Sequence, residues 1–149
     1  QCRKLGLKLC MHAGEEGPPE YVHQAIFDIA VDRIDHGNRA MEDPELIAAI
    51  VEKGLTLTVC PLSNTALKVI DGIESSPVAE MLGAGISATI NSDDPAYFGG
   101  YIGANYQAVA DGLKLDRAAM KQLAINSFAG SFLSEDAKAD HIKAINDLP

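Results

Sequence analysis

The sequence predicts an α/β fold in which parallel strands alternate with helices as part of a (β/α)8 barrel. Short β-rich runs alternate with helix-forming segments along the chain, and each run ends in polar residues. The strand-end residues His12, His36, Cys60 and Asp93 lie 24, 24 and 33 residues apart, which are lengths typical of βα units. A complete barrel needs about 250 residues. The four units in these 149 residues therefore make about half of a barrel.

The first two units begin with strands that lead to histidines. A strand over 5–11 leads to His12, and a second strand over 33–35 leads to His36. Between them, Pro18-Pro19 predicts a helix start, because proline is favoured in the first helical turn. The expected apolar stripe of this helix consists of Val22, Ile26, Ile29 and Ala30.

Helix-start and helix-stop residues delimit the helix of the second unit. Asp43 is placed to cap a helix that begins at Pro44, and Gly54 is placed to end it. The third strand, over 55–60, is expected to stop at Pro61, because proline cannot donate to a strand ladder.

The remaining elements complete the third and fourth units. Leu62-Ser63-Asn64 are expected to form a loop, and a helix is expected from Ser76-Pro77 to about Gly83. The fourth strand, over 86–90, leads to Asp93-Asp94. Further helices are expected over 101–113, 116–128 and 134–146.

An open, doubly wound sheet is the alternative fold, since strands alternating with helices suit both architectures. An open sheet usually concentrates its site at one switch point. Here all four strands carry polar groups at their C-terminal ends. This distribution favours the barrel, whose active site is built from the ends of several strands.

Composition narrows the classes of function. A hydrophobic content of 47% in 149 residues suits one soluble globular core. The net charge of −9 argues against nucleic acid or an anionic membrane as a partner and is compatible with a small neutral substrate. Three cysteines without C-x-x-C spacing predict free thiols in the cytoplasm. Because the chain begins at Gln1, we expect a processed or partial chain.

Three motifs carry the candidate chemistry, and each closes a β-rich run: His12-Ala13-Gly14-Glu15, Arg33-Ile34-Asp35-His36-Gly37 and Asn91-Ser92-Asp93-Asp94-Pro95. In a barrel the C-terminal strand ends meet at one mouth, so their histidines and carboxylates would converge. Such a set suits a metal-activated water surrounded by proton-transfer groups. Taken singly, the motifs also have plainer interpretations, as a structural histidine, a turn and a helix cap.

These motifs resemble those of the adenosine and adenine deaminases of the amidohydrolase superfamily. Four longer stretches are most similar to the adenine deaminase branch: 15–19, 33–37, 59–64 and 93–100. The resemblance runs from about Leu5 to the C-terminus. It implies that residues 1–149 form a partial metal-dependent hydrolase domain, the C-terminal half of a (β/α)8 TIM barrel with strands five to eight.

The resemblance also implies roles for five residues. His12 and Asp93 would be zinc ligands, His36 would act as general base, and Glu15 would protonate the purine ring nitrogen next to the attacked carbon. Asp94 would hold a second ring nitrogen through a hydrogen bond. The implied reaction is the zinc-dependent hydrolysis of adenine to hypoxanthine and ammonia, a step of purine salvage. Adenosine or an N6-substituted adenine is the alternative substrate.

Four neighbouring residues have roles that stay open. Asp35 would orient His36 or take part in substrate selection. Ser63 and Asn64 are loop formers, supports for other site residues or substrate contacts. Ser92 is a further candidate of the same kind, since it precedes Asp93 directly.

One feature of the family is absent from this sequence. The family takes two further zinc ligands from a His-x-His motif, and these 149 residues contain none. Catalytic zinc usually has three protein ligands. We therefore expect two further histidines from an N-terminal half of the barrel, a poorly active isolated chain, and exposed edges on its outer strands. A non-catalytic half-barrel that associates with a partner half or a second copy is the alternative function.

Overall fold

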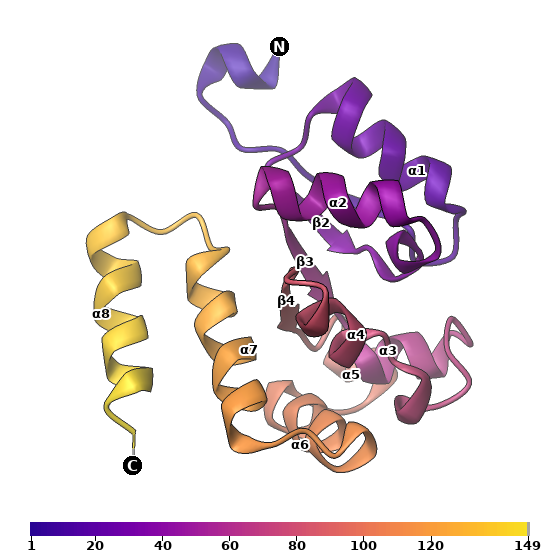
Figure 1. Ribbon diagram of the computed structural model, residues 1–149, viewed down its shortest axis with the longest axis vertical. Coiled ribbons are helices and arrows are strands. Elements are labelled where there is room, and N and C mark those ends of the chain that lie inside the picture. The colour runs from indigo at the N-terminus through magenta and orange to yellow at the C-terminus, as the bar shows by residue number, and fades with distance from the viewer. Residues whose placement is uncertain (149) are drawn as a thin grey trace.

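The computed structural model describes residues 1–148 and contains a parallel sheet of four strands flanked by helices (Figure 1). Each strand pairs with the next one along the chain, in the order β1-β2-β3-β4. This arrangement confirms the predicted α/β class with parallel strands and intervening helices. The strands are β1 (Cys10–Ala13), β2 (Arg33–His36), β3 (Thr56–Val59) and β4 (Ser87–Ile90).

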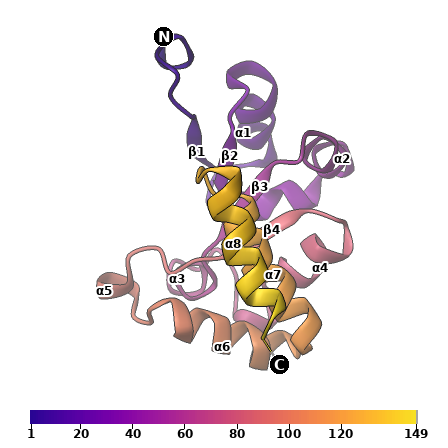
Figure 2. The ribbon, with the colours of Figure 1, turned by 90° about the vertical axis from the view of Figure 1, so that its left-hand side faces the viewer.

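Helices connect the strands and follow the last one. In both views the N-terminus lies at the opposite end of the molecule from α6, and α8 lies alongside α7, which packs against β4 (Figures 1 and 2). Every helix within residues 1–148 is too short or too polar to cross a bilayer. The α-helices are α1 (Pro19–His23), α2 (Pro44–Lys53), α3 (Pro61–Ala66), α4 (Val78–Gly83), α5 (Pro95–Phe98), α6 (Ile102–Leu113), α7 (Arg117–Ala129) and α8 (Glu135–Asn146).

The predicted ends of α2 are confirmed. The carboxylate of Asp43 accepts a hydrogen bond of 2.8 Å from the backbone N–H of Glu45, and Pro44 is the first helical residue. Gly54 follows the last turn with a φ of 62°, a left-handed conformation that glycine adopts without strain. The capping residues alone thus predicted where this helix begins and ends.

The prediction of a first strand over 5–11 was wrong in its limits. Residues Cys2–Leu5 form a 3-10 turn, and Leu5 and Leu7 are 70% and 56% exposed. Pairing with β2 begins only where Cys10 lies opposite Arg33. Within residues 1–148, β1 has a single neighbouring strand, and Leu9 extends this pairing by only one residue, its carbonyl accepting bonds from the backbone N–H groups of Asp32 and Arg33. Hydrophobicity alone therefore overestimated the length of the strand.

The expected loop at Leu62-Ser63-Asn64 was also wrong, because these residues lie inside α3. Pro61 occupies the first helical position, and the N–H of Asn64 donates to the carbonyl of Cys60 at 2.8 Å. The helix buries Ser63 and Asn64 completely. Proline thus ended the third strand, as expected, but it also started a helix.

The apolar stripe of the first helical segment is shorter than predicted. Val22 and Ile26 are buried, whereas Ile29 and Ala30 are exposed. The chain changes from α1 to a π-helical segment at Gln24–Ile29. A π-helical turn contains more residues than an α-helical one, so side chains after Ile26 rotate away from the sheet.

The two faces of the sheet differ in polarity. The face covered by helices carries core residues such as Ile34, Leu57 and Ala88, which have no exposed surface. The opposite face is polar, although barrel interiors are usually dominated by branched apolar side chains. Its residues form two rows across the strands: His12, Asp35, Thr58 and Thr89 in one, and Cys10, Arg33, Thr56 and Ser87 in the other.

Candidate active site

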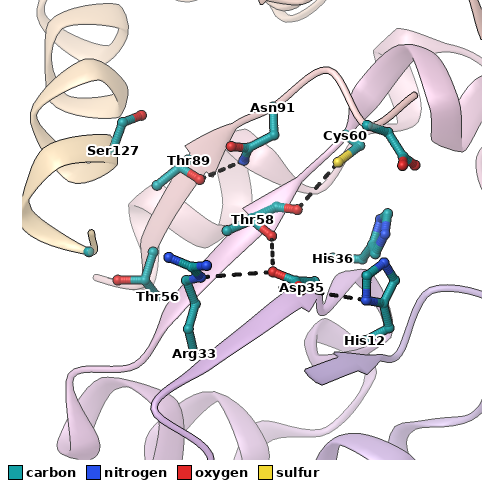
Figure 3. Close-up of a pocket in the computed structure, with 12 residues that line it drawn as sticks. His12, Arg33, Asp35, His36, Thr56, Thr58, Cys60, Thr89, Asn91 and Ser127 are labelled. Atoms are coloured by element: carbon teal, nitrogen blue, oxygen red, sulfur yellow. Dashed lines mark hydrogen bonds and ion pairs between the residues drawn. The ribbon is translucent and has the colours of Figure 1, made fainter. Parts of the chain in front are cut away.

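Residues from the ends of all four strands line a cavity of about 270 Å³ on the polar face (Figure 3). His12 belongs to β1 and His36 to β2, while Cys60 and Asp93 follow β3 and β4. The structure thus brings together four residues that span 81 positions of the sequence, from His12 to Asp93. Other lining residues are Arg33, Asp35, Thr56, Thr58, Thr89, Asn91, Ser127 and Gly130.

Glu15, His36 and Asn64 form a connected group at the mouth. Oε1 of Glu15 lies 3.3 Å from Nδ1 of His36. The amide nitrogen of Asn64 donates to the same Glu15 oxygen at 3.1 Å and lies 3.4 Å from Nδ1 of His36. The amide oxygen of Asn64 accepts a bond of 2.8 Å from Asn38, which fixes the orientation of the amide. Residues of three separate segments therefore hold one carboxyl group against one imidazole.

Burial shifts both members of the Glu15–His36 pair towards their neutral forms. The pKa of Glu15 is raised, chiefly by desolvation and next by the negative charge of Asp93. The pKa of His36 is lowered, chiefly by desolvation and next by the charge of His12. A protonated carboxyl group can donate a proton, and a neutral imidazole can accept one. The electrostatics therefore suit Glu15 as an acid and His36 as a base.

Asp93 has an unusual backbone conformation for a residue with a side chain. Its φ is 55°, in the left-handed region, where residues other than glycine are uncommon. Ser63 donates a hydrogen bond of 2.6 Å to Oδ2 of Asp93 and so fixes the carboxylate. Strained conformations of this kind cluster at functional sites, where the surrounding structure maintains them.

The residues present fit a zinc ion. Potential ligand atoms of His36, Cys60 and Asp93 all lie within 4.8 Å of one another. Burial and the nearby carboxylates of Asp93 and Glu15 raise the pKa of Cys60 to about 12, so its thiol is protonated when no metal is bound. The ring of His12 lies beside that of His36, with centroids 4.9 Å apart. Histidine nitrogens with a carboxylate oxygen are a donor set that zinc uses in catalytic sites.

The two predicted zinc ligands, His12 and Asp93, differ in how close they lie to other possible ligands. Both residues line the cavity. Asp93 belongs with His36 and Cys60 to the group whose ligand atoms lie within 4.8 Å of one another, whereas His12 does not, within residues 1–148. Its side chain is 66% exposed. His36 is close to both predicted ligands, with a ligand atom within 4.8 Å of one of Asp93 and its ring centroid 4.9 Å from that of His12.

Asp35 lies in the polar row, away from its predicted partner His36. Its carboxylate accepts a bond of 2.8 Å from Thr58 and lies 3.4 Å from Nδ1 of His12 (Figure 3). The backbone leaves the extended conformation after Asp35, since His36 and Gly37 have positive φ angles of 65° and 76°. Asp35 and His36 consequently have different neighbours.

Five predicted site residues do not line the cavity: Glu15, Ser63, Asn64, Ser92 and Asp94. Asp94 is exposed at the start of α5, where its side chain makes no capping bond. Ser92 is half-buried. The sequence also gave no indication of Asn38, since its contact with Asn64 depends on α3, which was expected to be a loop. Cys60 was recognised as a strand end but not as part of the cavity.

The sequence of this chain is similar to those of known deaminases. A sequence model of the family described as Adenosine deaminase matches residues 1–148. An adenine deaminase of Sphingopyxis alaskensis is 59% identical over 146 residues, which cover 98% of this chain and 43% of that protein. The chain thus spans less than half the length of the curated relatives it matches.

Solved structures show the same relationship. A crystal structure of adenine deaminase from Arthrobacter aurescens matches with a TM-score of 0.94 and 41% identity, over 97% of this chain and 44% of that chain. An amidohydrolase from Burkholderia ambifaria, solved with bound zinc, matches with a TM-score of 0.88 and 28% identity, over 97% of this chain and 41% of that chain. The four-stranded sheet with its helices therefore corresponds to part of these larger enzymes.

Proposed function

The chain belongs to the adenosine deaminase family, and from this membership we propose that it supplies the proton-transfer residues of a hydrolytic adenine deaminase. The observation that carries the proposal is the contact of 3.3 Å between Glu15 and His36 beside Asp93. The curated relatives with 59% and 52% identity are both named adenine deaminase, which favours adenine over adenosine and N6-substituted adenines as the substrate.

Glu15 acts as the general acid in this proposal. Its raised pKa favours the protonated carboxyl group, which donates to the ring nitrogen next to the amino-bearing carbon of adenine. Protonation makes that carbon more electrophilic. Asn64, which donates to Oε1 of Glu15, leaves Oε2 free of that bond and available to the substrate.

His36 acts as the general base. Its neutral imidazole accepts a proton from the attacking water, and the proton is later passed to the departing ammonia. The water oxygen bonds to the amino-bearing carbon, the proton that remains on this oxygen is released and restores the Glu15 carboxyl group, and the carbon–nitrogen bond breaks to give hypoxanthine and ammonia. Asp94 is proposed to hold a second ring nitrogen, which requires its exposed side chain to turn towards the substrate.

His12 and Asp93 are the residues proposed to hold zinc, with His36 facing the same position. A bound zinc ion would supply a Lewis acid that lowers the pKa of water to about 7. Ser63 fixes the Asp93 carboxylate through its bond of 2.6 Å. His12 and Asp93 are fewer than the three protein ligands usual for catalytic zinc, and we propose that two further histidines, which the family resemblance implies, come from another part of the barrel.

The remaining assignments follow from the same membership. We propose that β1 to β4 correspond to strands five to eight of the family barrel, so that residues 1–149 form a partial hydrolase domain. The partner surface is then the polar face of the sheet together with the outer edges of β1 and β4. The free thiols of Cys2, Cys10 and Cys60 favour the reducing cytoplasm as the compartment.

Product analysis tests this function. The full-length protein that carries this chain, loaded with zinc, is incubated with adenine, and hypoxanthine and ammonia are quantified. The proposal predicts equal amounts of the two products. Intact adenine after prolonged incubation with zinc-loaded, folded protein would contradict it and would favour the non-catalytic alternative.

A further inference from the structure

The carboxylate of Asp35 is surrounded by side chains from three strands. Oδ1 accepts a hydrogen bond of 2.8 Å from the hydroxyl of Thr58 on β3. The thiol of Cys10 on β1 lies 3.1 Å from both carboxylate oxygens. Nε of Arg33, two residues earlier on β2, lies 3.8 Å from Oδ1. These contacts hold the carboxylate in one orientation, so it is a fixed acceptor on the polar face (Figure 3).

The fixed carboxylate points one oxygen at His12. Oδ2 of Asp35 lies 3.4 Å from Nδ1 of the His12 ring. The sheet register accounts for this contact, because His12 and Asp35 are direct neighbours across β1 and β2. Thr58 is in turn the neighbour of Asp35 across β2 and β3. The hydroxyl, the carboxylate and the imidazole therefore form a line across three adjacent strands.

We infer that Asp35 is a positioning residue for His12, an inference that rests on the proposed zinc-dependent function. The carboxylate accepts the Nδ1–H of His12 and thereby selects the tautomer that carries its lone pair on Nε2. Histidines that bind metals usually donate their other ring N–H to a carboxylate or carbonyl, which fixes the ring and increases its basicity. Asp35 thus prepares the exposed His12 ring to bind zinc through Nε2.

The polar row gives Thr58 a supporting role in the same arrangement. Its hydroxyl has one proton to donate, and the structure directs it to Oδ1 of Asp35 rather than to the His12 side of the carboxylate. Oδ2 therefore receives no bond from Thr58 and has the thiol of Cys10 at 3.1 Å and Nδ1 of His12 at 3.4 Å. Removing the hydroxyl would free the carboxylate to rotate, so Thr58 acts on His12 only through Asp35.

Other roles for Asp35 predict other effects. A residue that orients His36 would change turnover and leave zinc affinity intact, because His36 would retain its place beside Glu15. A residue that selects the substrate would change KM for adenine relative to adenosine and leave zinc affinity intact. A purely structural residue would change thermal stability. Zinc affinity therefore separates the positioning role from these alternatives.

The test measures the zinc dissociation constant of the full-length protein by competition with a chromogenic chelator. Asp35→Asn removes the charge but keeps the size of the side chain, and we expect its affinity for zinc to be about 10- to 100-fold weaker. Thr58→Val should weaken binding less, in the same direction, and Thr58→Ser should restore it, since serine keeps the hydroxyl. Asp32→Asn is the matched control, because Asp32 bonds Leu9 and Lys8 instead of His12.

Three results would overturn the inference. Wild-type affinity in a folded Asp35→Asn variant would show that His12 does not depend on the carboxylate, while the proposed function would stand. Equal weakening in Asp32→Asn would show a general loss of stability. Failure of the wild-type protein to bind zinc or to deaminate adenine would overturn the inference and the proposed function together.

The cobalt-substituted protein gives a second readout. Displacement of His12 in Asp35→Asn should change the visible spectrum of the bound cobalt.

Discussion

The carboxyl group of Glu15 and the imidazole of His36 lie 3.3 Å apart, and the desolvation of each favours its neutral form. Gly14 makes this approach possible. Its φ of 67° turns the chain between His12 and Glu15, and a Cβ there would lie 2.5 Å from Val22. The pair therefore depends on a residue without a side chain, which lies two positions after His12, one of the proposed zinc ligands.

Glu15→Gln should lower the turnover of adenine by about 10²- to 10⁴-fold, because glutamine cannot donate the proton that a carboxylic acid supplies. Zinc content should stay unchanged, since Glu15 is not a proposed ligand. Steady-state kinetics and metal analysis of the full-length protein measure both quantities. Glu16→Gln is the matched control. Turnover equal to wild type in Glu15→Gln would exclude Glu15 as the general acid.

His12→Ala should lose zinc and activity together, since the proposal makes His12 a ligand. His23→Ala is the control, because His23 lies on α1 and contacts Phe27 instead of the cavity. Metal analysis after dialysis against a weak chelator measures the loss. Full zinc occupancy in the His12 variant would exclude it as a required ligand.

Asn64→Ala should lower both stability and turnover. The substitution leaves the buried amide of Asn38 without its partner and removes the donor to Glu15, at a cost of about 1 to 3 kcal/mol in unfolding free energy. Asn126→Ala is the matched control, since buried Asn126 donates to the carbonyl of Ala88 away from Glu15.

Comparison of the two asparagine variants separates folding from catalysis. Urea unfolding should show similar losses of stability, whereas only Asn64→Ala should reduce turnover per folded, zinc-loaded molecule. A matched reduction in both variants would indicate that Asn64 acts through stability alone.

Asp32→Asn should lower the free energy of unfolding by about 1 kcal/mol at neutral pH. This value is low for hydrogen bonds to a charged group, because the site is partly exposed to solvent. The backbone N–H of Leu9 and the ammonium of Lys8 lower the pKa of Asp32 below its ordinary 3.8. Its stabilising effect is therefore fully present above pH 3.8 and is lost as the pH falls through the lower, folded-state pKa.

Urea titrations over a range of pH measure this dependence. The difference in unfolding free energy between wild type and Asp32→Asn should narrow as the solution is acidified below the ordinary pKa of aspartate. Asp28→Asn, an exposed change of the same charge, is the control. A difference that is constant at all pH values would show that the charge of Asp32 contributes nothing to stability.

The alternation of strands with helices and the ends of α2 were predictable because they depend on local chemistry. The spacing of His12, His36, Cys60 and Asp93 predicted four βα units, and the structure places all four residues at one cavity. Asp43, Pro44 and Gly54 predicted the limits of α2 correctly because capping involves neighbours in sequence. These features need no knowledge of tertiary contacts.

The contacts that complete the site were not predictable from local sequence. The position of Asn64 depends on α3, whose helical turn was expected to be a loop. The direction of Asp35 depends on strand register, since a shift of one residue would turn its side chain to the other face of the sheet. The sequence alone therefore left His36 and the substrate as its candidate partners, whereas the register of β1 and β2 brings it to His12.

The most direct measurement is ultraviolet-monitored deamination of adenine and adenosine, side by side, by the zinc-loaded full-length protein that carries this chain. The proposed function predicts that adenine is converted faster than adenosine and that Glu15→Gln abolishes most of this conversion. A preference for adenosine would contradict the assigned substrate. Absence of conversion of either purine by folded, zinc-loaded protein would contradict the deaminase function itself.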